Sequence, residues 1–213
     1  MGRIRREFIR REDELTPKLF IITTEGTKTE PKYFNDLAQF YNNSKVHVEV
    51  LNRDKGGTSP RQLISMLDSF CAVYQVGEED ELWIIMDRDK QTWTERQLSE
   101  VARLCNQKLN YFLGVSNPSF ELWLILHYKD ISDYSESEQR LLLENRKVGN
   151  RTKVKKELSD LIRGYKESNL NTSKFLGKER IAIRRARRID NRQERWPNSL
   201  GTRVYLLVER III

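Results

Sequence analysis

The chain has 213 residues, of which 38% are hydrophobic and 32% are charged. That length suffices for one well-buried core, or for one core and a small appendage, and the composition excludes a disordered chain. The longest apolar runs, near residues 82–86 and 122–126, are far too short to span a bilayer, so we expect no association with a membrane.

The net charge of +7 is concentrated in two stretches, the arginine-rich residues 3–11 and residues 178–203. Basic segments suit a polyanionic partner, although a solvated helix face and a frayed terminus explain the charge equally well. Cys71 and Cys105 lie far apart without metal-finger spacing, which indicates reduced, structural thiols. No apolar signal core follows the first arginines, so we expect a cytoplasmic protein.

The first half of the chain alternates between strand and helix patterns. Residues 18–24 are continuously apolar and rich in β-branched side chains, which predicts a buried strand. A helix should follow from the N-cap Thr29 to about residue 41. Residues 46–51 alternate as a half-buried strand, and Ser59-Pro60 begins the next helix.

The same alternation continues to about residue 128. Residues 82–86 predict a third strand, which is followed by a helix from Thr94. Residues 111–115 predict a fourth strand, and another helix should begin near Pro118. This order is typical of βαβ units, so we predict an α/β fold with a mainly parallel sheet of about four strands flanked by helices.

The remaining residues predict mainly helices, at 135–148, 150–166, 174–193 and 202–212. We therefore divide the chain into three parts. They are a basic N-terminal arm (1–14), a catalytic α/β core (15–128), and a helical, basic C-terminal part (129–213) packed on the core.

Two glutamates flank the end of the first predicted strand. Glu25 follows the strand and Glu30 lies in the first turn of the next helix, while Gly26 between them permits a tight turn. Both carboxylates can face one pocket at the carboxyl edge of the sheet, where ligands bind in open α/β folds. Alternatively, Glu30 only complements the helix dipole and Glu25 is an ordinary turn residue.

The string Asp87-Arg88-Asp89 directly follows the third predicted strand. Strand alternation places Asp87 and Asp89 on the same side, and carboxylates so close repel each other unless a cation lies between them. With Glu25 and Glu30 they form a set of hard oxygen ligands. Such a set, with few histidines and no cysteine nearby, predicts a Mg²⁺ or Mn²⁺ site.

Ser119 and Glu121 follow the fourth predicted strand, where a hydroxyl and a carboxylate can join the same metal cluster. The alternative is a plain helix N-terminus, with Asn117 as N-cap, Pro118 at the first position and Glu121 as the capping-box acid. This string alone does not decide between the two.

Four strings together resemble the RloB family, which includes the AbiLii-type abortive-infection proteins: IITTEGTKTEPKYF, IIMDRD, SNPSFELWLILHY and NSLGTRVYLLV. The resemblance spans almost the whole chain and implies a Toprim-like fold, in which a strand-end glutamate and a DxD pair carry Mg²⁺-dependent chemistry at phosphodiesters. Glu25 matches that glutamate, and Asp87 and Asp89 match the DxD. The resemblance also implies an ATPase partner protein and a role in anti-phage defence.

OLD-type nucleases, which share the Toprim fold, use a second metal site with a further early acid, a Ser-x-Glu and a downstream lysine. Glu30 matches the acid, and Ser119 and Glu121 match the Ser-x-Glu. The candidates for the lysine are Lys153, Lys155 and Lys156, of which we select Lys156.

A row of arginines recurs at every fourth position of the helix predicted near residues 179–192. The row consists of Arg180, Arg184, Arg188 and Arg192, flanked by Arg187. We predict that these side chains contact phosphates of nucleic acid and position it without reading its sequence. A solvated face or a docking surface for a partner protein are the alternatives.

These motifs predict a Mg²⁺-dependent nuclease that cleaves RNA, with tRNA as one candidate, or DNA. The predicted catalytic residues are Glu25, Asp87, Asp89, Glu121 and Lys156, and the predicted metal ligands are Glu25, Glu30, Asp87, Asp89, Ser119 and Glu121. Two other functions stay open: a phosphohydrolase acting on small phosphoesters, and a non-catalytic subunit that binds nucleic acid for a defence ATPase.

Overall fold

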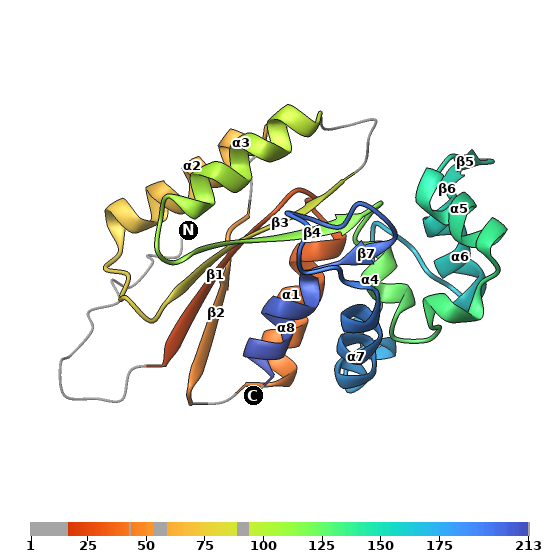
Figure 1. Cartoon of the computed structure of the whole chain (residues 1–213). Coiled ribbons are helices and arrows are strands. Elements are labelled where there is room, and N and C mark those ends of the chain that lie inside the picture. Colours follow the sequence, from red (N-terminus) through yellow and green to blue (C-terminus); the bar gives the residue numbers. More distant parts are fainter. Residues whose placement is uncertain (1–16, 43, 53–58, 89–93, 213) are drawn as a thin grey trace.

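The computed structural model describes residues 17–42, 44–52, 59–88 and 94–212. Within these ranges, a mainly parallel sheet carries helices on both of its faces (Figure 1). The predicted α/β class is therefore confirmed, although the described part of the sheet has five strands rather than about four. The additional strand comes from the C-terminal part, where the sequence pattern predicts mainly helices.

The described strands are β1 (Lys18–Thr24), β2 (Val46–Val50), β3 (Glu81–Asp87), β4 (Tyr111–Asn117), β5 (Lys147–Val148), β6 (Arg151–Thr152) and β7 (Gly201–Thr202). The α-helices are α1 (Thr29–Phe40), α2 (Pro60–Val73), α3 (Glu95–Asn106), α4 (Glu121–Ile125), α5 (Glu136–Glu144), α6 (Lys153–Leu161), α7 (Glu179–Ile189) and α8 (Val204–Ile211). Two short 3-10 helices cover Ile131–Asp133 and Thr172–Lys174. None of the helices within the described ranges is long and apolar enough to cross a membrane.

The strand order in the sheet is β2-β1-β3-β4-β7, with the first four strands parallel and β7 antiparallel to β4. Thr24 of β1 pairs with Ile85 of β3, so these two strands end at the same edge. The chain passes from β1 to β2 on one side and then crosses to β3 on the other. The carboxyl ends of β1 and β3 therefore form the switch point, where open α/β sheets bind ligands.

Alternate residues of β1 and β3 point into two separate hydrophobic cores. Ile22 and Trp83 belong to the larger core, together with residues of α1, α4 and α8, whereas Ile21 and Leu82 belong to the smaller core with α2 and α3. In Figure 1, α2 and α3 lie above the sheet and α1 and α8 below it. Because both faces of β3 are covered, its sequence is continuously apolar rather than alternating.

The helices of the first half begin close to where the sequence predicts. Ser59 and Thr94 are N-caps with complete capping boxes at the starts of α2 and α3. Thr29, by contrast, is the first residue of α1, and the N-cap Lys28 makes no side-chain capping bond. The Thr29 hydroxyl instead donates to the Glu167 carbonyl oxygen at 3.1 Å, which ties a distant C-terminal segment to the start of α1.

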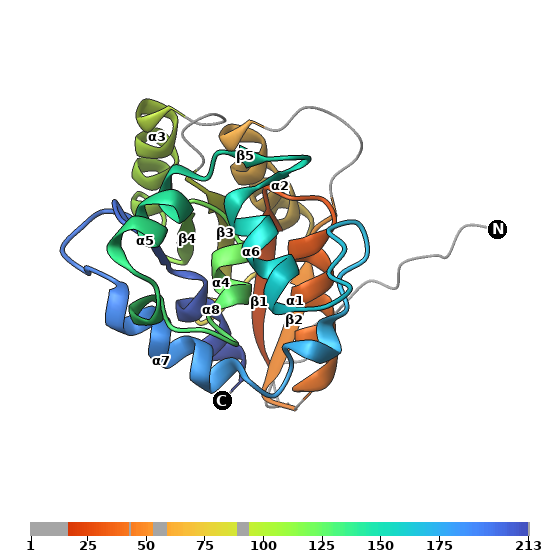
Figure 2. The ribbon, with the colours of Figure 1, turned by 90° about the vertical axis from the view of Figure 1, so that its right-hand side faces the viewer.

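The C-terminal part contains shorter helices than its periodicity predicts. The helix expected over 135–148 ends at Glu144, because Asn145 adopts a left-handed backbone with φ 49°. The next helix begins at Lys153, after a two-stranded hairpin formed by β5 and β6 whose turn contains Gly149 at φ 65°. Figure 2 shows this hairpin with α5 and α6 on one side of the molecule.

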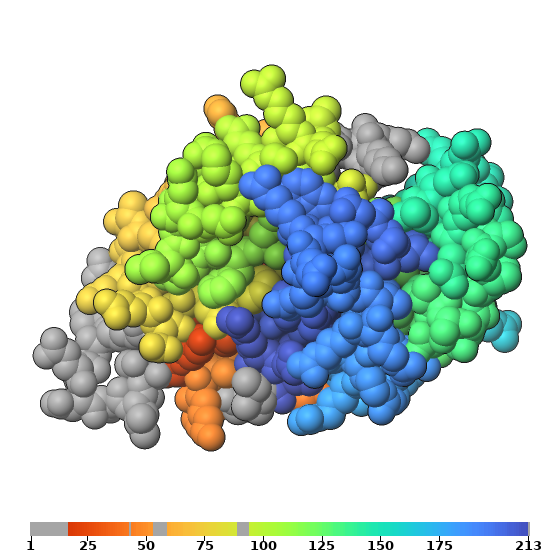
Figure 3. Space-filling view, viewed as in Figure 1, coloured from red at the N-terminus to blue at the C-terminus, as the bar shows by residue number. Residues whose placement is uncertain are grey.

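The end of the chain completes the sheet and the larger core. Strand β7 pairs with β4, and the buried Ser116 and Thr202 hydroxyls hydrogen-bond at 2.8 Å. Helix α8 buries Val204, Leu207 and Val208 in the larger core. In the space-filling view, the blue C-terminal residues lie across the middle of the face, between the green and the teal residues (Figure 3).

Candidate functional site

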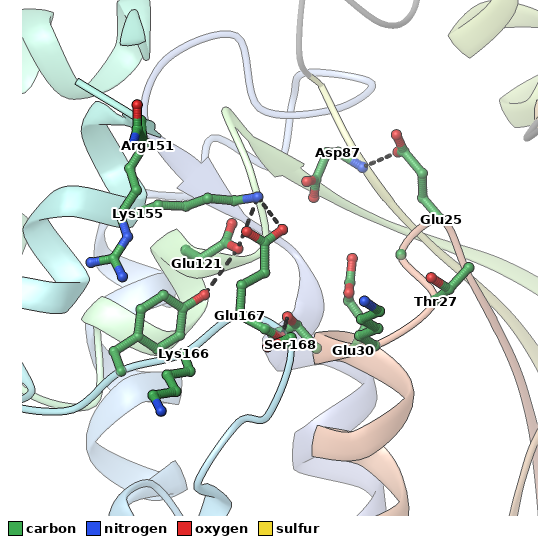
Figure 4. Close-up of a pocket in the computed structure, with 15 residues that line it drawn as sticks. Glu25, Thr27, Glu30, Asp87, Glu121, Arg151, Lys155, Lys166, Glu167 and Ser168 are labelled. Atoms are coloured by element: carbon green, nitrogen blue, oxygen red, sulfur yellow. Dashed lines mark hydrogen bonds and ion pairs between the residues drawn. The ribbon is translucent and has the colours of Figure 1, made fainter. Parts of the chain in front are cut away.

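A cavity of about 800 Å³ lies at the carboxyl ends of β1 and β3, at the predicted switch point (Figure 4). Five acidic residues line it, and we call this cavity the acidic pocket: Glu25, Glu30, Asp87, Glu121 and Glu167. Its other walls come from the start of α1, the start of α6 and the segment 165–168. The structure thus brings together acidic residues that the sequence places after three different strands.

Glu25 is fixed at the end of β1 by hydrogen bonds to β3. Its backbone N–H donates to the Ile85 carbonyl oxygen at 2.9 Å, and its Oε2 accepts from the Asp87 backbone N–H at 2.9 Å. These bonds hold the Glu25 carboxylate beside Asp87 (Figure 4). Glu25 is therefore part of the pocket architecture and not an ordinary turn residue.

Glu30 is only 8% exposed, although it lies in the first turn of α1. Its carboxylate packs against the backbone of Gly26, where any Cβ atom would overlap both carboxylate oxygens. Because residue 26 is a glycine, the Glu30 carboxylate can occupy the space that a side chain at this position would take. The reading of Glu30 as an exposed complement of the helix dipole does not explain this burial.

Two of the pocket carboxyl groups, those of Glu30 and Asp87, have a raised pKa. Burial first, and then the charges of Glu121 and Glu25, raise the pKa of Glu30 from 4.5 to about 7. Burial and the charges of Glu30, Glu25 and Glu121 likewise raise the pKa of Asp87 well above its usual value, opposed by the Phe120 backbone N–H. The cluster therefore binds protons, or a cation in their place, more strongly than separate carboxylates would.

Glu121 is held in the pocket by two hydroxyl groups. The Ser119 hydroxyl donates to its Oε2 at 2.8 Å, and the Tyr165 hydroxyl donates to its Oε1 at 3.2 Å. The capping alternative for Glu121 is contradicted, because Phe120 is the N-cap of α4 and no side chain caps this helix. Asn117, the expected N-cap, instead donates its amide N–H to the Pro197 carbonyl oxygen at 3.0 Å.

Ser119 does not line the pocket, and the structure places it next to the Glu121 carboxylate instead. Because its hydroxyl donates to Glu121, it orients a pocket carboxylate. Asp89, the other member of the predicted DxD pair, lies outside the described residues.

Of the three candidates Lys153, Lys155 and Lys156, Lys155 lines the pocket, so the selection of Lys156 is corrected. The Lys155 ammonium lies 3.8 Å from Glu121 Oε1 and pairs with Glu167. Lys156 points away and binds Asp160 at 2.8 Å, because consecutive residues of a helix face different directions. Burial lowers the pKa of Lys155, but Glu121, Glu167 and Asp87 outweigh that effect and raise it above its usual value.

Sequence reasoning missed Tyr165 and Glu167 at this site. Both lie in the segment after α6, which packs against the pocket only in the folded chain. Tyr165 is 44 residues from Glu121, and no motif links the two positions. The sequence signal for Tyr165 is weak: it is an aromatic residue within a charged stretch.

The predicted arginine row does not line the acidic pocket. Within the described residues, Arg187 pairs with Glu209, Arg188 lies 3.2 Å from Asp130, and Arg192 lies 3.2 Å from the Tyr205 hydroxyl. Arg180 and Arg184 face a separate groove between α7 and α8. Much of this row therefore attaches α7 to neighbouring segments.

The donor set fits a hard divalent cation only with water completing the coordination. Among the described residues, no three acidic, histidine or cysteine side chains come close enough to enclose an ion by themselves. Mg²⁺ retains several waters and uses one or two carboxylates, so a pocket of about 800 Å³ lined by repelling carboxylates suits it.

A family model described as RloB-like protein matches residues 20–211, which is nearly the whole chain. No curated protein matches the chain, and no solved structure does.

Proposed function

The chain belongs to the RloB-like family, and we propose that it is a nuclease that uses Mg²⁺ or Mn²⁺ to hydrolyse phosphodiester bonds in RNA or DNA. One observation carries this proposal: Glu30, Asp87 and Glu121 lie together in one pocket at the switch point, where burial and the neighbouring charges raise the pKa of Glu30 and Asp87. Such repulsion is costly unless a cation or a proton relieves it, and perturbed carboxyl groups gathered in a cleft are typical of a functional site.

Glu30, Asp87 and Glu121 would hold the cation, with Asp89 retained as a ligand predicted from the sequence. When bound, the ion would supply charge stabilisation at phosphate oxygens and lower the pKa of a water molecule. Glu25, fixed beside Asp87, would act as a further ligand or as an acid or base at the scissile phosphate. Lys155 stays protonated and would stabilise negative charge on the reacting phosphate.

In this reaction, water adds to phosphorus and one P–O ester bond breaks. The products are a phosphate monoester and a free hydroxyl, and the leaving oxygen takes up a proton. Water is the proposed nucleophile, since the one tyrosine hydroxyl in the pocket, Tyr165, is buried and already donates to Glu121. The role in anti-phage defence and the ATPase partner, which the family resemblance implies, complete the proposal.

The test is cleavage of plasmid DNA and bulk tRNA with Mg²⁺ or Mn²⁺ by wild type, Asp87→Asn and Glu121→Gln. Both variants should lose metal-dependent cleavage by on the order of a hundredfold or more. The matched control is Asp160→Asn, which makes the same chemical change on the exposed side of α6, outside the acidic pocket. Cleavage that survives in Asp87→Asn and Glu121→Gln would contradict the proposal.

Two other outcomes identify the alternatives. Turnover of small phosphoesters, sensitive to Asp87→Asn and without any polynucleotide cleavage, would indicate a phosphohydrolase. Nucleic-acid binding by an inert wild type calls for addition of the ATPase partner. If the wild type still cleaves nothing with that partner present, the result would indicate a subunit that only binds nucleic acid.

A further inference from the structure

The outer wall of the acidic pocket carries positive charge. Lys28, Arg151 and Lys166 line the pocket, are exposed, and have no carboxylate partner among the described residues. We call these three side chains the cationic wall. The only side-chain bond described for them runs from the Arg151 guanidinium to the Ser159 hydroxyl at 2.6 Å.

These cations come from three separate segments of the chain. Lys28 lies between β1 and α1, Arg151 lies in β6, and Lys166 lies in the segment after α6. Their meeting around one pocket is a product of tertiary structure and not of a local basic run. They also differ from Arg187 and Arg188 of α7, which are paired with carboxylates.

The charges of the pocket are arranged asymmetrically. Figure 4 places Arg151 and Lys166 on the opposite side of the pocket from Glu25 and Asp87. A phosphate at these carboxylates would therefore face Arg151 and Lys166 across the pocket. A small phosphoester carries no second phosphate to meet them, whereas every nucleotide of a nucleic-acid strand adds one.

The burial of the pocket carboxylates favours a single-stranded nucleic acid over a duplex as the ligand. Glu30 and Glu121 are only 8% and 4% exposed, so the reacting phosphate must enter a recess to reach them. A duplex presents its phosphates on a stiff, convex surface. An unpaired strand can bend its backbone into the recess and lay the neighbouring phosphates on the rim.

We infer that Lys28, Arg151 and Lys166 bind the phosphates on either side of the scissile one in an unpaired nucleic-acid strand. This inference rests on the proposed nuclease function, because only a cleaved strand has a scissile phosphate. The binding that it describes can still be measured without cleavage. It also replaces the α7 arginines as the first candidates for substrate contact. The cationic wall contacts only the backbone and so reads no base sequence.

The test measures binding of a short fluorescein-labelled single strand, as DNA and as RNA, to the full chain carrying Asp87→Asn. Fluorescence anisotropy is recorded over a range of salt concentrations. Adding Arg151→Ala and Lys166→Ala should weaken binding about tenfold and reduce the slope of log K against log salt by roughly 1.4, at about 0.7 for each lost phosphate contact.

The matched control adds Lys147→Ala and Lys156→Ala in place of those two substitutions. It removes the same charge from the hairpin and from α6, but neither residue lines the pocket. Binding by the control should stay within about twofold of the parent. Equal losses in both variants, no loss in either, or tighter binding of a labelled duplex than of the single strand would overturn the inference. Thermal unfolding verifies that each variant is folded.

Cleavage assays separate this inference from the proposed function. If the wild type cuts nucleic acid and the Arg151→Ala/Lys166→Ala variant cuts it with an unchanged KM, the inference fails and the nuclease function stands. If the wild type cuts nothing even with the ATPase partner present, but binding depends on Arg151 and Lys166, the inference stands and the nuclease function fails.

Discussion

At the residue scale, the absence of a side chain at Gly26 leaves room for the carboxylate of Glu30. The Glu30 carboxylate occupies the space that a Cβ atom of residue 26 would need. The atoms in conflict are at the far end of a flexible side chain, so a substitution would displace the carboxylate rather than break the fold. Position 26 therefore controls the geometry of the acidic pocket more than its stability.

We expect Gly26→Ala to change the free energy of unfolding by less than about 1 kcal/mol but to weaken Mn²⁺ binding, because Glu30 can no longer reach its place. Calorimetric titration with Mn²⁺ and thermal unfolding measure the two effects. The matched control is a double-mutant cycle with Glu30→Ala, in which Gly26→Ala should cause no further loss of affinity. Additive losses would show that the two positions act independently.

The raised pKa of Glu30 makes stability depend on pH in the metal-free protein. Because its pKa is about 7 when folded and near 4.5 when unfolded, the folded state holds its proton more tightly. Its contribution is fully present below pH 4.5 and is lost as pH rises through about 7. This contribution is on the order of 3 kcal/mol across that interval.

Thermal unfolding with EDTA from pH 4.5 to 8 tests this dependence. Glu30→Gln should flatten the fall of the melting temperature over that range, because the amide has no proton to lose. Added Mg²⁺ should raise the melting temperature of the wild type more at pH 8 than at pH 6, since the ion replaces the lost proton. A variant with the same pH profile as the wild type would show that Glu30 is not the titrating group.

At the scale of elements, helix α6 directs the side chains of two neighbouring lysines, Lys155 and Lys156, to different surroundings. It packs against α4 and directs Lys155 toward Glu121, while Lys156 faces Asp160 and solvent. One step along a helix turns the side chain by more than a quarter of a turn, so only one of the two can enter the pocket. Sequence alone offers no reason to choose between them, because both lie in the same Lys-Val-Lys-Lys run.

We expect Lys155→Ala to reduce metal-dependent cleavage on the order of a hundredfold, because a preorganised positive charge at the reacting phosphate is lost. Lys156→Ala is the matched control and should stay within about twofold of the wild type. Single-turnover cleavage with saturating enzyme measures both. A larger loss in Lys156→Ala than in Lys155→Ala would contradict the assignment of Lys155 as the lysine that acts in the pocket.

At the scale of the whole molecule, the larger core depends on both ends of the chain. Trp83 of β3 and Phe20 of β1 share this core with Val204, Leu207 and Val208 of α8. Strand β7 also covers the edge of β4. The C-terminal part is thus structurally continuous with the sheet, although its sequence is more charged and more helical.

The fragment 15–128, the predicted catalytic core, should therefore fail to fold alone. Without α8 it would expose the apolar face of the sheet that carries Trp83, and without β7 it would leave β4 as an open edge. Near-ultraviolet circular dichroism and thermal unfolding of the fragment and of the full chain measure whether the fragment is folded. A cooperative transition in the fragment would establish an independent core domain.

The sequence determined the α/β class, the starts of α2 and α3, and four of the acidic residues that line the pocket. These features follow from local causes: apolar runs, capping residues, and carboxylates placed directly after buried strands. Glu25 and Asp87 could be paired in advance because parallel strands end at one edge of a sheet. The role of Glu121 stayed open, since a strand end and a helix start coincide there.

Only the tertiary structure decided which distant groups complete the pocket. Tyr165, Lys155, Arg151 and Lys166 reach it because the segments after β4 fold back over the start of α1, where Thr29 donates to the Glu167 carbonyl oxygen. The two residues that form β7 gave no strand signal, because so short a segment is defined by its partner β4 rather than by its own side chains. Local patterns fix where a strand or a helix begins. Which side chains meet across the molecule depends on packing between segments far apart in the sequence.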